Sequence, residues 1–142
     1  IEAGLKLHNR GAGASDVERM FGAFVEHYAA HVADRSQPFP GLDQALDALA
    51  AQDCRFAVCT NKLEGLSVQL LDALKLSHYF GAVIGPDTLG ISKPDPRPYF
   101  EAVKRLQLAE PRSIMVGDSE TDILTARAAN VPVIAALSDS WN

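Results

Sequence analysis

This sequence of 142 residues contains no apolar run of the roughly 20 residues that are needed to cross a bilayer. Basic residues are also scarce: 13 lysines and arginines face 18 aspartates and glutamates, which gives a formal net charge of −5. That balance argues against nucleic acid or an anionic membrane as the main partner. The length fits one domain of ordinary size with a small appendage.

Cysteine is nearly absent as well, with two residues in the whole chain. Cys54 and Cys59 bracket an apolar run, and an extended chain of that length would hold their Cα atoms about 17 Å apart, too far for a disulfide. Neither has a histidine or a second thiol at the spacing of zinc ligands. We therefore expect two buried thiols in a protein of the reducing cytoplasm.

Short β-prone runs alternate with helical patterns from residue 38 onward. Strands are expected at 55–59, 82–84, 114–116 and 131–135, and helices at about 42–51, 63–74, 96–108 and 123–129. An alternation of this kind predicts an α/β fold of the Rossmann-like class, with a parallel sheet and helices on both of its faces.

The first 37 residues have a different pattern. Ser15 and Glu18 have the spacing of a capping box and predict the start of a helix that buries one apolar face. His27 and His31, four residues apart on another side of this helix, could bind a metal ion, but no third ligand is evident. The stiff Pro38-Phe-Pro-Gly41 turn cannot continue a helix, so we place the boundary of the main domain there.

Two carboxylates follow the strand predicted at 114–116. Asp118 comes directly after the strand and its glycine, and Asp122 lies one helical turn further on. Because ligands bind at the carboxyl ends of strands in open α/β sheets, a hard cation such as Mg²⁺ would suit this pair. Alternatively, Asp118 caps the following helix and Asp122 is a solvated acid in its first turn.

Polar residues also follow the strand at 55–59 and precede the helix at 96–108. Thr60 and Asn61 offer side chains for a phosphate, and the turn after them offers backbone N–H groups at a helix start. Lys93, followed by rigid proline-rich backbone, offers a positive charge for phosphate oxygens and for charge that develops in the transition state. Together with a cation at Asp118 and Asp122, these residues predict a site for a phosphoryl group.

The same strings resemble the second, third and fourth motifs of the haloacid dehalogenase superfamily, and within it they are most similar to the phosphoglycolate phosphatases. The matching strings are Thr60-Asn61-Lys62, Lys93-Pro-Asp-Pro96, and Gly117-Asp118-Ser-Glu-Thr-Asp122 followed by Ala126-Arg-Ala-Ala. The resemblance implies that Thr60 binds phosphate, that Lys93 steadies nucleophile and phosphate, and that Asp118 is a Mg²⁺ ligand with Asp122 beside it. It also implies that residues 1–37 belong to a helical cap and residues 38–142 to the α/β core.

The activity implied by this resemblance is Mg²⁺-dependent hydrolysis of a small phosphorylated metabolite, 2-phosphoglycolate, through an aspartyl-phosphate. However, the family's first motif, Asp-x-Asp-Gly-Thr, which carries the nucleophile and the acid/base aspartate, does not occur in this sequence. In the family its strand lies mid-sheet, between the strands that here end at Cys59 and Val116. We therefore expect that strand to lie outside these 142 residues, and the 142 residues alone to be inactive.

Other functions remain open within this resemblance. One is another capped phosphatase or a sugar phosphomutase, and a second, from a different class, is a non-catalytic relative that serves as a binding or scaffold module. The joint presence of Thr60, Lys93, Asp118 and Asp122 argues against a scaffold, which has no need of all four. A metal-free dehalogenase is disfavoured because the paired acids favour a cation.

Overall fold

A computed structural model of the chain describes residues 13–107 and 112–136. It divides into two compact units, Ile1–Ser36 and Gln37–Asn142, which are described separately below. None of the described helices is both long enough and apolar enough to cross a membrane.

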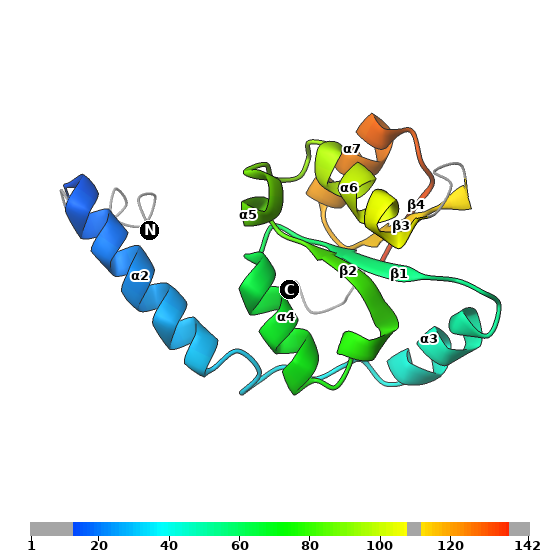
Figure 1. Cartoon of the computed structure of the whole chain (residues 1–142), viewed down its shortest axis with the longest axis horizontal. Coiled ribbons are helices and arrows are strands. Elements are labelled where there is room, and N and C mark those ends of the chain that lie inside the picture. Colours follow the sequence, from blue (N-terminus) through cyan, green and yellow to red (C-terminus); the bar gives the residue numbers. More distant parts are fainter. Residues whose placement is uncertain (1–12, 108–111, 137–142) are drawn as a thin grey trace. The chain divides into compact units, whose positions relative to one another are not determined.

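The first unit contains one described helix, α2 (Ala14–Ala30; Figure 1). Its N-cap is Gly13 and no side chain caps it, so the predicted capping box is wrong: Ser15 already lies inside the first turn. The prediction that α2 buries an apolar face is also wrong, since Phe21 and Phe24 are 49% and 56% exposed and no residue of α2 is buried. Apolar spacing alone shows which face could be buried, not what covers it.

The second unit is built on four short parallel strands. β1 (Phe56–Cys59) pairs with β2 (Phe80–Ile84), and β3 (Met115–Gly117) pairs with β4 (Val133–Ala135). The two pairs form separate two-stranded sheets, so β1 and β3 are not bonded to each other. Parallel strands that alternate with helices confirm the predicted α/β class.

The larger helices lie where the sequence places them. They are α3 (Leu42–Ala50), α4 (Glu64–Ala73), α6 (Arg97–Leu106) and α7 (Glu120–Ala129). In Figure 1, α6 and α4 lie on opposite sides of the β1–β2 pair, as expected for helices on both faces. Two one-turn elements were not predicted: the 3-10 helix η1 (Ser77–Tyr79), and α5 (Pro86–Leu89), where the sequence indicated only a turn.

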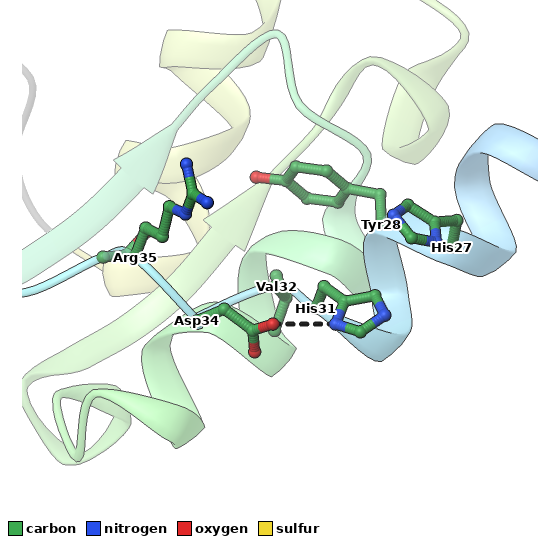
Figure 2. A pocket seen from close by; sticks show the side chains of 7 residues that line it. His27, Tyr28, His31, Val32, Asp34 and Arg35 are labelled. Atoms are coloured by element: carbon green, nitrogen blue, oxygen red, sulfur yellow. Dashed lines mark hydrogen bonds and ion pairs between the residues drawn. The ribbon is translucent and has the colours of Figure 1, made fainter.

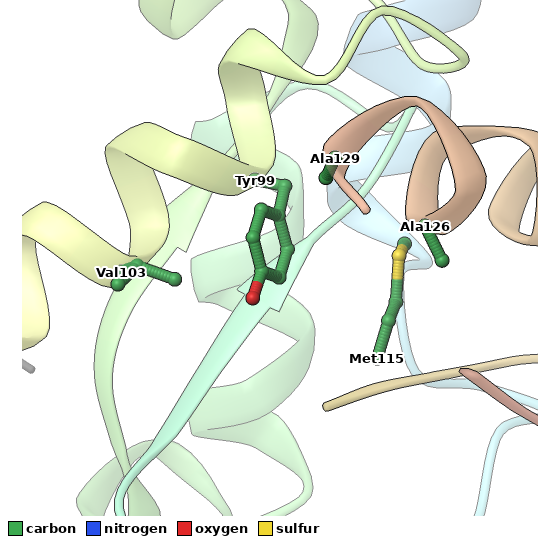
Figure 3. Packing of buried hydrophobic residues seen from close by; sticks show 5 residues of the cluster. All are labelled: Tyr99, Val103, Met115, Ala126 and Ala129. Carbon is green, nitrogen blue, oxygen red and sulfur yellow. The ribbon is translucent and has the colours of Figure 1, made fainter. Parts of the chain in front are cut away.

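A buried cluster ties α6 and α7 to β3. It consists of Tyr99, Val103, Met115, Ala126 and Ala129 (Figure 3). The alanines on α7 let that helix approach the strand closely, while Tyr99 and Met115 fill the remaining space. This packing fixes where the start of α6 lies relative to the end of β3, and both contribute to the site described below.

The β3–β4 pair keeps one apolar face uncovered by the described residues. Val116 is 63% exposed and Ile114 and Ile134 are each 55% exposed. Strands of parallel sheets are normally covered on both faces, so exposure of this kind is unusual.

The two cysteines are less buried than predicted. Both are free thiols, but Cys54 is exposed and Cys59 is only half-buried. Their places along the chain agree with the prediction, since Cys54 precedes β1 and Cys59 ends it.

Candidate active site

Hydrogen bonds join three loops of the second unit that carry the predicted site residues. Thr60 and Asn61 follow β1, Lys93 precedes α6, and Asp118 and Asp122 follow β3. Asn61 bonds to Lys93, Lys93 to Asp122, and Asp122 to the backbone of Asp118. The structure therefore brings the predicted residues together, although they come from widely separated parts of the chain.

Thr60 is held by the end of the β1–β2 pair. Its backbone N–H donates to the Ile84 carbonyl at 2.9 Å, which extends the strand pairing by one bond. Its Oγ1 accepts a hydrogen bond from the Lys62 N–H at 3.1 Å. Because Oγ1 is the acceptor there, its own hydrogen can be donated to a ligand oxygen such as that of a phosphate.

The side-chain amide of Asn61 pairs with the backbone of Lys93. Asn61 Nδ2 donates to the Lys93 carbonyl at 3.1 Å, and the Lys93 N–H donates to Asn61 Oδ1 at 2.8 Å. The sequence predicts Asn61 as a substrate-binding residue, whereas the structure gives its amide two partners within the protein. The two loops are 32 residues apart in sequence, so local pattern could not show this contact.

The ammonium of Lys93 is paired with Asp122. Lys93 Nζ lies 2.5 Å from Asp122 Oδ1, and the two side chains are only 10% and 7% exposed. Burial raises the pKa of Asp122, but hydrogen bonds from Lys93 and Ser119 outweigh that effect, so its pKa lies below the ordinary value. Asp122 is therefore a carboxylate at neutral pH and fixes where the Lys93 ammonium points.

The second oxygen of Asp122 is occupied by the loop that precedes its own helix. Oδ2 accepts hydrogen bonds from Ser119 Oγ at 2.6 Å and from the backbone N–H groups of Ser119 and Asp118 at 3.1 and 3.2 Å. The side chain lies so close to Gly117 that a Cβ there would be 2.4 Å from the Asp122 Cβ. Both carboxylate oxygens of Asp122 thus have protein donors, which was not foreseen for a predicted metal ligand.

Asp118 has the opposite environment. Its side chain is exposed and makes no hydrogen bond or ion pair with the residues that the structure describes. The N-cap of α7 is Ser119, which forms a capping box with Asp122, so the alternative reading of Asp118 as the cap is wrong. A carboxylate with unused oxygens at the end of a strand has the chemistry of a Mg²⁺ ligand.

The described residues do not supply a set of three side-chain ligands for a metal ion. Within 13–107 and 112–136, no group of three or more histidine, cysteine, aspartate or glutamate side chains is placed to hold a metal ion. Mg²⁺ commonly binds through one or two carboxylates together with water and substrate phosphate. Asp118 therefore fits such an ion as one of its ligands.

The predicted anion site at the start of α4 is partly occupied by the protein itself. The Glu64 N–H donates to Asp87 Oδ1 at 2.8 Å, and the Lys62 N–H is used by Thr60. Asp87, which sequence analysis missed, thus caps α4 from the one-turn helix α5. Gly85 makes this approach possible, since a Cβ there would lie 2.4 Å from the Glu64 nitrogen.

Cys59, at the end of β1, is a neighbour of this site that sequence analysis did not connect with it. Burial raises the pKa of its thiol; the charge of Lys93 lowers it, and that of Asp122 raises it further. The net shift is upward, so Cys59 is a neutral thiol at pH 7. It contributes packing beside the Lys93–Asp122 pair and no charge.

A hollow of about 440 Å³ lies in the first unit, at the end of α2 (Figure 2). Its lining includes Tyr28, His31 and Arg35, which the resemblance places in the cap. The His27 and His31 rings lie 4.6 Å apart, and His31 Nδ1 is 2.7 Å from Asp34 Oδ2.

Comparison with known proteins gives consistent matches along most of the chain. The family model for haloacid dehalogenase-like hydrolases matches residues 6–136. The phosphoglycolate phosphatase of Mesorhizobium japonicum is 37% identical over 135 residues, which are 95% of this chain and 60% of that protein. That of Agrobacterium fabrum is 43% identical over 120 residues, 84% of this chain and 52% of that protein. The chain thus spans between half and two thirds of the length of these relatives.

Two crystal structures share the fold. A predicted phosphoglycolate phosphatase from Haemophilus somnus matches with a TM-score of 0.85 at 26% identity, over 95% of this chain and 60% of that one. A HAD-superfamily hydrolase from Geobacter sulfurreducens matches with a TM-score of 0.62 at 32% identity, over 68% of this chain and 49% of that one. These matches confirm the fold expected from the sequence.

Proposed function

The chain belongs to the haloacid dehalogenase-like hydrolases, and from this premise we propose that it is part of a Mg²⁺-dependent phosphomonoester hydrolase whose substrate is 2-phosphoglycolate. The observation that carries the proposal is the continuous set of hydrogen bonds that joins Asn61, the residue after Thr60, to Lys93, Asp122 and the Asp118 backbone. The names of the two relatives described above support the choice of substrate.

Each of these residues has a defined task in the proposed reaction. Thr60 donates its hydroxyl hydrogen to a phosphate oxygen. Lys93, oriented by Asp122, stabilises the negative charge on the phosphoryl oxygens as the ester bond breaks. Asp118 would hold Mg²⁺, which when bound neutralises charge on the phosphate that acidic side chains would otherwise repel.

The nucleophile belongs to a segment outside residues 1–142. A carboxylate of that segment attacks phosphorus, and as the P–O ester bond breaks the leaving oxygen takes a proton from the acid/base aspartate of the same segment and departs as the alcohol. That aspartate then takes a proton from the water that attacks the aspartyl-phosphate, which releases phosphate and restores both carboxyl groups. We place its strand between β1 and β3, which lie in separate sheets. The exposed apolar face of the β3–β4 pair, which includes Val116, supports a further segment that covers this face. Residues 1–37 are then the end of a cap, and residues 38–142 the core.

A mass measurement tests this placement directly. A purified, folded and monomeric natural protein of 15.3 kDa, the mass of these 142 residues, would contradict it. A heavier protein that contains an Asp-x-Asp-Gly-Thr string before residue 1 would agree with it.

Activity is tested on the intact protein with 2-phosphoglycolate and a panel of other phosphate esters, with Mg²⁺ and with chelator. We expect hydrolysis that requires Mg²⁺ and that falls by about 10²–10³-fold in Lys93→Ala and in Asp118→Ala, the usual effect of removing one electrostatic stabiliser. Asp43→Ala, an exposed acid on α3, is the matched control and should retain activity. Activity that survives in both site variants would overturn the assignment, and a preference for another ester would change the substrate.

A further inference from the structure

We infer that Asn61 is a positioning residue that acts through Lys93, and that it does not itself bind the phosphate. Its amide fixes the backbone from which the Lys93 side chain reaches toward the site. This inference deepens the proposed function and rests on it for the role of Lys93, but its geometry can be tested without any assay of activity.

The first observation is the two-point contact between the loops. Asn61 Oδ1 accepts from the Lys93 N–H and Asn61 Nδ2 donates to the Lys93 carbonyl, so the amide satisfies both backbone groups of one residue. A pair of antiparallel strands makes the same exchange between two backbones. Here a side chain takes the place of the second strand and joins the loop after β1 to the loop before α6.

The second observation is that the Lys93 backbone has no alternative support. Among the residues that the structure describes, the two bonds from Asn61 are the only hydrogen bonds of its N–H and carbonyl. The nearest loop bond runs from the Asp95 N–H to the Ser92 carbonyl, on either side of Lys93. Removal of the Asn61 amide would therefore leave the Lys93 N–H and carbonyl without a hydrogen-bond partner among the described residues.

The third observation is the fixed position of the other end of the Lys93 side chain. Nζ is held by Asp122 at 2.5 Å, so the aliphatic chain extends between an anchored backbone and an anchored ammonium. With both ends fixed, the ammonium has little freedom of position. The Asn61 Oδ1 atom is a hydrogen-bond acceptor, so it would repel phosphate oxygens, and it already accepts a hydrogen bond from the Lys93 N–H. These partners favour positioning over direct phosphate binding.

A double-mutant cycle on the intact protein distinguishes the two roles. We expect Asn61→Ala to lower kcat by about 10- to 100-fold, the usual effect of a small misplacement, while KM changes by less than about threefold. In a Lys93→Ala background the same substitution should cause no further loss, because Asn61 acts through Lys93. Gln69→Ala, which removes an exposed amide from α4, is the control and should leave both constants unchanged.

A full additional loss from Asn61→Ala in the Lys93→Ala background, or an effect confined to KM, would overturn the inference and assign Asn61 to the substrate. Amide hydrogen exchange of Lys93, followed by NMR, gives a readout that needs no catalysis. Loss of one hydrogen bond should accelerate this exchange by up to about tenfold in Asn61→Ala. Unchanged exchange contradicts the contact itself, whereas an inactive wild-type protein contradicts only the proposed function.

Discussion

At the residue scale, Asp118 and Asp122 differ although only three residues separate them. Asp122 is buried and bonded to Lys93 and Ser119, whereas Asp118 is exposed and its carboxylate has no hydrogen bond or ion pair with the described residues. We expect Asp122→Ala to reduce the free energy of unfolding by about 3–5 kcal/mol, because it leaves the Lys93 ammonium buried without a partner. Asp118→Ala should change it by less than about 0.5 kcal/mol. Urea unfolding of the intact protein in chelator measures both.

Chelator is essential in that comparison because a bound cation would stabilise the protein through Asp118 and mask the difference. Asp122→Asn is the control for shape: it keeps an acceptor for the α7 N-terminus but lacks the charge that pairs with Lys93, so its cost should fall between those of the two alanine variants. Equal costs for Asp118→Ala and Asp122→Ala would contradict the separate roles assigned to the two carboxylates.

A second prediction at the residue scale concerns the pKa of Asp95, which lies two residues after Lys93. Hydrogen bonds from the Arg97 guanidinium and from its backbone N–H lower the pKa of Asp95 from 3.8 to about 2. A depressed carboxyl pKa stabilises the folded state above the unfolded value of 3.8, and this contribution is lost as the pH falls toward 2. Arg97→Gln should raise the pKa of Asp95 toward 3.8, as measured by NMR titration of the carboxyl carbon. An unchanged pKa would show that the ion pair does not exist in solution.

At the scale of elements, substitution of two glycines by alanine should change the stability of the protein in opposite directions. A Cβ at Gly117 would lie 2.4 Å from the Asp122 Cβ and Cγ, whereas at Gly65, inside α4, it would meet nothing within 4 Å among the described residues. We therefore expect Gly117→Ala to destabilise the protein by about 1–3 kcal/mol through overpacking. Gly65→Ala should stabilise it by up to about 1 kcal/mol through better helix propensity. Thermal unfolding of the two variants checks both signs, and stabilisation by Gly117→Ala would show that Asp122 does not pack against this loop.

The elements that the sequence predicts well are those with a repeated local signal. The helices α3, α4, α6 and α7 begin and end within a few residues of their predicted bounds, because each has two or more turns of patterned residues. The single-turn α5 and η1 have no such pattern and were missed. The contact from Asn61 to Lys93 and the cap from Asp87 to Glu64 span 32 and 23 residues, so spacing within one element cannot reveal them.

The two capping-box sequences also show that a local pattern does not reveal tertiary contacts. Ser119 and Asp122 form a capping box in the structure, whereas Ser15 and Glu18, which have the same spacing, do not. Asp122 is held in place by Lys93 from another loop, a restraint that the helix start at residue 14 does not have among the described residues. The motif therefore predicts a helix start, but tertiary contacts decide whether the box closes.

At the scale of the whole molecule, the second unit has more apolar sheet surface than its described residues cover. Two parallel pairs of strands stand unjoined, and Val116, Ile114 and Ile134 are more than half exposed. A strand with unpaired backbone groups and an apolar face is a site for pairing with another segment. The sequence could predict this only through the missing first motif, since composition and periodicity describe the residues present and not those that would cover them.

The last prediction follows from this surface and concerns the intact protein. If a segment outside residues 1–142 covers this face of the β3–β4 pair, Val116 becomes buried, although it is 63% exposed among the residues described. Val116→Lys should then cost about 2–3 kcal/mol of unfolding free energy through lost burial of the valine. Val68→Lys is the control, since Val68 is 38% exposed on the unrelated helix α4 and should cost less. Urea unfolding of both variants gives the comparison, and equal small costs would mean that this face of the β3–β4 pair stays exposed to solvent in the intact protein.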